Sequence, residues 1–296
     1  MSRRYRSSNL RAFTLVELLL AMSILTVLVI LLSSLLGGVS RAWISGEQQV
    51  ETFQDGRAIL ELISRELDQA VISPKLQMVQ NVSLPSTASE RSAASNLFWQ
   101  ANLTSTSAGD LCEVGYFLDS NFRLMRFFVP PTDTTNYQIF SSAPSDIAAT
   151  WTGAAGTAAL NTTISNNVIA LWIRCFDANG DPIPWSSTAP PPAAPMKFNS
   201  AAHFQPAIPG VASSFKYTSA NTFQAHLLPA FVELTIITID SKSLLRSSNL
   251  VPAMPAVAGP SEIPDAIDAF HRDLIANNVK NAHTFSTRVS LKARGL

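Results

Sequence analysis

Glu17 is the residue whose type and position point most clearly to chemistry. It is the one charged residue between Arg11 and Arg41, and it stands at the start of a long apolar run. A carboxylate beside hydrocarbon is costly unless a cation or hydrogen bonds compensate it. The chemistry open to Glu17 is therefore charge pairing with a cation.

The other candidate residues are isolated from one another. The four histidines have no partner at metal-ligand spacing: His203, His226, His271 and His283. No nucleophile elbow, phosphate loop or dinucleotide fingerprint occurs. The stretch 177–181, Asp-Ala-Asn-Gly-Asp, has the composition of a calcium loop but lacks the spacing and closing glutamate of an EF-hand, and Asn-Gly is typical of a turn. We therefore expect no metal, no cofactor and no enzymatic activity.

The two cysteines, Cys112 and Cys175, fall in segments that we predict as strands. If these segments lie outside the cytoplasm, oxidising conditions permit a disulfide. Closing a loop of this length would stabilise the fold by up to about 4 kcal/mol. Two buried free thiols are the alternative, because sequence does not show whether the Cα atoms come within reach.

The elements that must position these residues begin with a basic leader, 1–12, which has four arginines and no acid. Residues 13–40 follow as a predicted transmembrane helix, since about 22 apolar residues span about 33 Å. Arginines before a span hold the N-terminus in the cytoplasm. The alternatives are a plain anchor or a signal peptide cleaved at 40–42, although the run exceeds the usual apolar region of a signal peptide.

Residues 41–73 continue as an amphipathic helix. An apolar stripe recurs at helical spacing between charges of mixed sign: Trp43, Val50, Phe53, Leu60, Ile63, Leu67 and Val71. Ser73-Pro74 ends the pattern. We expect one helix over 13–72 with a mild break at Gly37-Gly38, because glycine costs about 1 kcal/mol in a helix interior.

The segment 12–17, Ala-Phe-Thr-Leu-Val-Glu, resembles the processing site of type IV prepilins. The resemblance implies that a prepilin peptidase cuts between Ala12 and Phe13 and N-methylates Phe13, so that Glu17 becomes the fifth mature residue. The family usually has glycine before the cut, and here the residue is Ala12.

On this resemblance, cleavage creates a cationic amine on Phe13 that can neutralise the Glu17 carboxylate of a neighbouring subunit. Removing one partner of a buried pair is strongly unfavourable, so the pairing would fix the register of assembly. The alternative is a glutamate that snorkels to the lipid interface or is protonated.

Residues 74–296 form a predicted β-rich periplasmic domain. Strands are expected over 97–103, 113–118, 123–129, 168–176, 229–239 and 285–291. A short helix is expected over 264–279, and surface loop insertions are expected near 141–166, 186–222 and 247–264. Strands that follow strands favour antiparallel pairing. The fold class is therefore α+β, with a long N-terminal helix packed on an antiparallel sheet, as in pilins.

Several segments of this domain are similar to minor pseudopilins, above all the J-type subunit of type II secretion and the related W-type minor pilins. They lie at 114–119, 124–126, 173–177, 228–234 and 285–289. The Verru_Chthon cassette protein C family is similar over the whole length. The resemblance implies a structural minor subunit of a type IV pilus-like or type II secretion filament.

The same resemblance implies the partners and location. The partners are the prepilin peptidase, sibling minor subunits, inner-membrane lipid and, indirectly, an assembly platform and ATPase. A net charge of zero and no basic tract beyond the leader argue against nucleic acid. The alternatives are a major pilin, which length and insertions disfavour, and a membrane-anchored periplasmic binding or enzymatic domain that uses only the prepilin export route.

Overall fold

The computed structural model describes residues 14–72, 76, 78–81, 84, 86, 91, 96–103, 109–137, 150–183, 185, 198–199 and 228–292. The chain divides into two compact units, Met1–Val50 and Glu51–Leu296. We call them the N-terminal unit and the globular unit, and each is described by itself.

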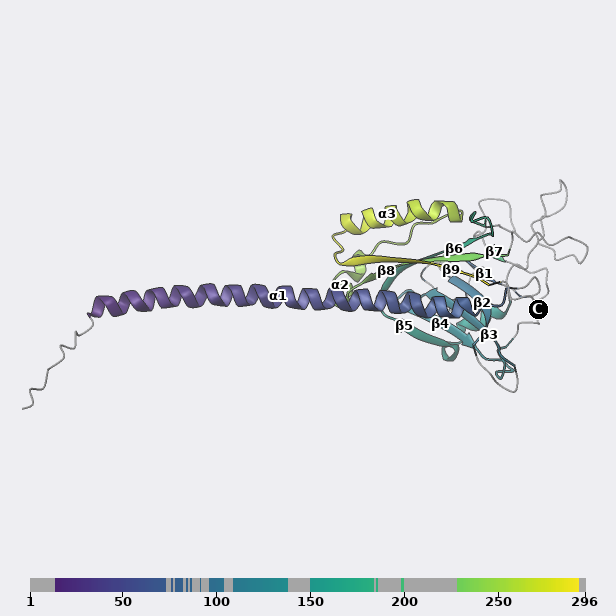
Figure 1. The fold of residues 1–296 in the computed structure, drawn as a ribbon, viewed down its shortest axis with the longest axis horizontal. Coiled ribbons are helices and arrows are strands. Elements are labelled where there is room, and N and C mark those ends of the chain that lie inside the picture. The colour runs from purple at the N-terminus through teal and green to yellow at the C-terminus, as the bar shows by residue number, and fades with distance from the viewer. Residues whose placement is uncertain are drawn as a thin grey trace, which may run out of the picture. The chain divides into compact units, whose positions relative to one another are not determined.

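Helix α1 runs without interruption over Leu15–Asp68 (Figure 1). The expected break at Gly37-Gly38 is wrong, because leucines and other residues that support a helix on both sides continue the hydrogen-bond pattern through the glycines. The helix ends before the expected Ile72. Ala70 instead forms a β-bridge with Ala101, and the Val71 amide donates to the Gln100 carbonyl at 2.8 Å.

The described strands form two antiparallel sheets. The larger sheet has the order β5-β4-β3-β2-β1-β7, with strands Asn161–Ser165, Leu124–Val129, Leu111–Leu118, Asn96–Asn102, Val79–Gln80 and Phe198–Asn199. The smaller has the order β6-β8-β9, with strands Val168–Phe176, Phe231–Ile239 and Ala282–Ser290. The predicted α+β class and antiparallel pairing are confirmed, with two sheets where one was expected.

Side-chain caps hold the two predicted hairpin turns. The amides of Asn121 and Arg123 donate to Asp119 Oδ1 at 2.9 and 2.8 Å, which closes the β3–β4 turn. After β6, the amides of Asn179 and Asp181 donate to Asp177 Oδ1, both at 2.9 Å. Gly180 has φ +89°, a conformation that favours glycine. Both turns are confirmed.

Two of the expected surface insertions contain short elements of regular structure over the residues that the structure describes. The first contains 3₁₀ helices at Thr150–Gly156 and Ala158–Leu160 and then strand β5. The third follows helix α2 (Ser241–Ser247), contains 3₁₀ turns η5 (Ser248–Leu250) and η6 (Pro260–Glu262), and leads into helix α3 (Ile263–Ala276). It is ordered because its apolar residues pack on the core: Val251, Met254 and Val257. Residues 141–149 and most of 186–222 lie outside the described residues.

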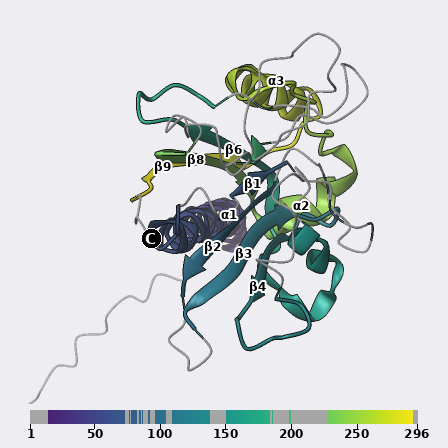
Figure 2. The same cartoon turned by 90° about the vertical axis from the view of Figure 1, so that its right-hand side faces the viewer.

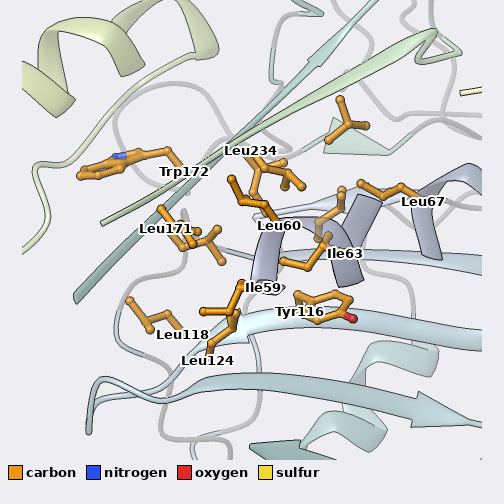
Figure 3. Close-up of a cluster of buried hydrophobic side chains, with 14 of the residues drawn as sticks. Ile59, Leu60, Ile63, Leu67, Tyr116, Leu118, Leu124, Leu171, Trp172 and Leu234 are labelled. Carbon is orange, nitrogen blue, oxygen red and sulfur yellow. The ribbon is translucent and has the colours of Figure 1, made fainter. Parts of the chain in front are cut away.

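The second part of α1 lies between the two sheets of the globular unit (Figures 2 and 3). Four of its apolar side chains are buried in one cluster with residues of both sheets: Ile59, Leu60, Ile63 and Leu67. Burying them contributes about 6 to 12 kcal/mol, at roughly 1.5 to 3 kcal/mol each. The predicted apolar face is confirmed over this stretch.

Glu66 joins this buried face of α1 to the larger sheet. Its carboxylate accepts from the guanidinium of Arg126 on β4 at 2.6 Å and from the hydroxyl of Tyr116 on β3 at 2.6 Å. Burial, together with the charge of Glu66, raises the pKa of Tyr116, so that its hydroxyl stays protonated and donates. Burial lowers the pKa of Arg126, but the bonds and charge of Glu66 outweigh this effect and keep that pKa raised.

Replacing Glu66 should destabilise the globular unit much more than replacing an exposed acid of the same helix. Glu66→Ala leaves Arg126 without its carboxylate and should lower the free energy of unfolding by about 3 to 5 kcal/mol. The control is Glu61→Ala, which removes an exposed ion pair with Arg65 and should cost under about 1 kcal/mol. Denaturant unfolding of the full chain in detergent, followed by tryptophan fluorescence, measures both. Equal losses would refute the anchoring role of Glu66.

Candidate functional site

The first turn of α1 holds Glu17 in a capping box with Thr14. The Thr14 amide and hydroxyl each donate to Glu17 Oε2 at 3.0 Å, and the Glu17 amide donates back to Thr14 Oγ1 at 3.3 Å. Thr14 is thus the N-cap residue and Glu17 the third helical residue, as the Thr-x-x-Glu signature requires. This arrangement satisfies amides that the start of a helix would otherwise leave without partners.

Sequence reasoning placed Glu17 at this site but missed the role of Thr14. The sequence signal for a capping box was present, because Thr14 stands three residues before Glu17. Among the described residues, the hydrogen bonds that the Glu17 carboxylate accepts all reach Oε2. The predicted cleavage pair, Ala12 and Phe13, lies outside the described residues, and cleavage there remains a prediction.

The N-terminal unit presents apolar side chains on every face of α1. From Leu15 to Val39 each large apolar side chain is more than half exposed. Among the described residues, α1 is the one helix long and apolar enough to cross a membrane. Its hydroxyl groups suit hydrocarbon, since Ser23 and Thr26 donate to the carbonyls of Leu20 and Met22 at 2.8 Å. Such a surface requires lipid or other helices around it.

The predicted disulfide between Cys112 and Cys175 is not formed. Neither cysteine forms a disulfide, both are buried, and they lie in different sheets, on β3 and β6. The Cys175 thiol is within 3.6 Å of Gln80 Oε1, and burial raises its pKa to about 12. The alternative of two buried thiols is therefore correct, and the cysteines serve packing.

The described histidines take part in packing contacts. His271 Nε2 and Thr284 Oγ1 lie 2.7 Å apart, and the ring of His283 lies 4.7 Å from that of Phe53. His203 and His226 fall outside the described ranges. Within those ranges, no group of three His, Cys, Asp or Glu residues is close enough to hold a metal. In the stretch 177–181, the Asp177 carboxylate accepts hydrogen bonds from backbone amides, and these bonds lower its pKa.

Comparison with protein families finds the prokaryotic N-terminal methylation motif at residues 7–33. These residues include the Ala12–Phe13 junction, Thr14, Glu17 and the first half of the apolar run. The motif supports a type IV pilin-like exported protein and implies processing by a prepilin peptidase and pilin-type assembly. No curated protein and no solved structure matches the chain.

The capping box predicts different effects for two substitutions at the helix start. Thr14→Val removes the cap, so amide exchange over residues 15–18 should rise about fivefold, the effect of losing an N-cap worth about 1 kcal/mol. Glu17→Gln is the control, because glutamine also completes a capping box and should leave exchange nearly unchanged. Hydrogen exchange of the full chain in detergent micelles, read by NMR, measures both. Faster exchange in Glu17→Gln than in Thr14→Val would contradict this account.

Proposed function

We propose that this chain is a minor pilin or pseudopilin subunit. It would be exported to the inner membrane, cleaved between Ala12 and Phe13, and built into a type IV pilus-like or type II secretion filament, which it could prime or cap. The observation that carries the proposal is the methylation motif at 7–33, in register with a capped helix whose apolar side chains are exposed all round. We infer a single span, with the N-terminus cytoplasmic and residues 74–296 in the periplasm.

Glu17 would recruit the processed N-terminus of a neighbouring subunit. Cleavage leaves a cationic amine on Phe13, and N-methylation keeps its charge. Because the capping box uses Glu17 Oε2, the amine of a neighbour can approach Oε1 without dismantling the helix start. A pair removed from water discriminates strongly against misplaced neighbours, which would leave one charge alone.

We propose a structural rather than an enzymatic role. Two ion pairs of the globular unit join charged side chains that are buried or half-buried and help to pack its elements together, Glu66 with Arg126 and Arg174 with Glu233. A membrane-anchored periplasmic enzyme or binding domain would instead be expected to gather unpaired polar groups in a cleft.

The finer assignment to J-type or W-type minor subunits rests on the shared segments. The segments fall mainly on β3, β4, β6, β8 and β9, which are the strands around the second part of α1. The shared segments therefore support the proposal that this chain and those minor subunits pack their strands around the helix in the same way. Sibling minor subunits as partners, and the Verru_Chthon cassette protein C family as relatives, are proposed by the same analogy.

Mass spectrometry of the mature chain tests the processing. The expected N-terminus is N-methylated Phe13, because the methylation motif spans the Ala12–Phe13 junction. Deleting the prepilin peptidase should leave the 1–12 leader attached. A mature chain that starts near Trp43 would show signal-peptide cleavage instead and would overturn the filament proposal.

Two variants separate the charge of Glu17 from its capping role. Glu17→Gln keeps the capping box but loses the charge, so it should be processed yet fail to enter filaments. Thr14→Val loses the cap but keeps the charge, so it should still co-assemble. Filament fractions from cells that also produce the sibling subunits provide the measurement. Normal incorporation of Glu17→Gln would refute the pairing role and favour a chain that only uses the export route.

A further inference from the structure

The exposed large apolar side chains of the globular unit gather at one end. Over the described part of Glu51–Leu296 they are Phe53 (38% exposed), Leu245 (84%), Leu250 (48%) and Ile275 (77%). The other large apolar side chains described there are buried or half-buried. Exposed apolar groups that cluster in this way mark a contact surface.

Contacts within the globular unit place these four residues together. Phe53 lies where α1 enters the unit, and its ring packs on those of His283 and Phe285 near the start of β9. The last residue of β8, Ile239, pairs with Ala282, the first residue of β9. Helix α2, with Leu245, follows β8 directly. We call this region the entry end.

Leu250 and Ile275 belong to the same region. The Asn277 side chain, just after α3, donates to the Leu250 carbonyl at 3.0 Å. Figure 1 shows α2 at the end of the unit where α1 enters, and the last turn of α3 leads back to the start of β9. All four exposed side chains thus lie at the entry end.

Leu245 is held outward by an ordered helix. Asp240 caps α2, because its Oδ1 accepts from the Ser243 amide at 2.9 Å. Its Oδ2 accepts from Asn281 Nδ2 at 3.1 Å, which ties the cap to the segment before β9. The exposure of Leu245 is therefore built into the fold.

The chain itself keeps the entry end near a bilayer. The apolar run of α1 ends at Val39, and Trp43, a residue type enriched at membrane interfaces, follows it. The globular unit begins at Glu51, eight residues after Trp43 in the sequence. A surface tethered so closely meets lipid at high effective concentration.

We propose that the entry end lies in the membrane interface while the subunit is anchored and unassembled. Leu245, Leu250 and Ile275 would insert at the boundary between headgroups and acyl chains. The exposed Lys242, Arg246 and Lys280 around them can extend to the phosphates. This inference rests on membrane anchoring and does not require the filament role.

Acidic and basic side chains nearly balance at the entry end, so its contact with lipid should be mainly apolar. The acids Glu51, Asp55 and Asp273 are also exposed near the entry end, and with the exposed Arg272 counted they offset all but one of its four basic residues. A zwitterionic bilayer should therefore suffice, and anionic lipid should add little. A sibling protein is the competing occupant, and the test below distinguishes it.

Spin labels on the full chain in phosphatidylcholine nanodiscs test the proposal. Leu245→Cys and Ile275→Cys supply the label sites, and the native Cys112 and Cys175 are buried. The control is Ala178→Cys, an exposed site after β6, since Phe176 pairs with the first residue of β8 at the opposite end of the sheet. Power saturation compares collision with oxygen, which concentrates in lipid, and with a nickel chelate, which stays in water.

Labels at 245 and 275 should show at least about threefold less nickel collision than the label at 178, with oxygen collision kept high. Equal nickel access at all three sites would overturn the proposal. Shielding from both reagents that arises only when sibling subunits are added would also overturn it, in favour of a protein partner.

A charge variant provides a second readout that does not depend on the labelled residues. In Leu245→Glu/Ile275→Glu, a label at Leu250→Cys should regain nickel access, because carboxylates disfavour the interface. These positions are exposed, so the fold should be unaffected, and tryptophan fluorescence checks this. Unchanged shielding at 250 in the folded variant would refute insertion of the entry end.

Discussion

The globular unit depends on the packing of α1 between two sheets that do not pair with each other. Ile59, Leu60, Ile63 and Leu67 supply the apolar contact to both sheets, but apolar packing alone does not fix how a helix is rotated about its axis or shifted along it. Glu66 adds this specificity, since its carboxylate meets a guanidinium and a phenol that stand on adjacent strands. Strands β3 and β4 are thereby fixed in one position relative to the helix. The sheet β6-β8-β9 covers the opposite side of the helix.

At its start, the same helix has groups that need hydrogen-bond partners. A carboxylate in an apolar segment needs hydrogen bonds, and the first turn of a helix needs acceptors for its free amides. The capping box of Thr14 and Glu17 meets both needs with one side-chain pair. Glu17 is thereby held in a defined place at the start of the helix, with both bonds from Thr14 on Oε2.

The regular elements could be predicted because their own residues carry the signal. The range 168–176 was predicted with the bounds that β6 has, since it is a run of apolar, strand-forming residues, interrupted only by Arg174, before an Asn-Gly turn. Strand β5 was missed because it is an edge strand with Ile164 as its one apolar residue among Asn, Thr and Ser, so its pairing with β4 leaves no apolar pattern. Ser, Thr and Ala in that stretch therefore looked like a loop.

Features that join distant residues could not be predicted. Glu66 and Arg126 are 60 positions apart, and in the sequence Glu66 is one of several charges on an amphipathic helix. The cysteines occupy predicted strands, but strand prediction does not say which sheet each strand joins, so the sequence left both a disulfide and two buried thiols open. At the candidate site, by contrast, Glu17 and its link to Thr14 are both local, and the Thr-x-x-Glu spacing carried the signal for the capping box.

On the proposed function, a polar interaction has to set the direction of assembly. The apolar side chains of α1 are covered by hydrocarbon in the membrane and would be covered by other helices in a filament. Lipid tails are as apolar as leucine, so the hydrophobic effect hardly distinguishes these two environments. The distinction must come from a group that is better satisfied in one of them. Glu17 is the one charged residue in the apolar run, and on this proposal the cation that its carboxylate gains comes from a neighbouring subunit.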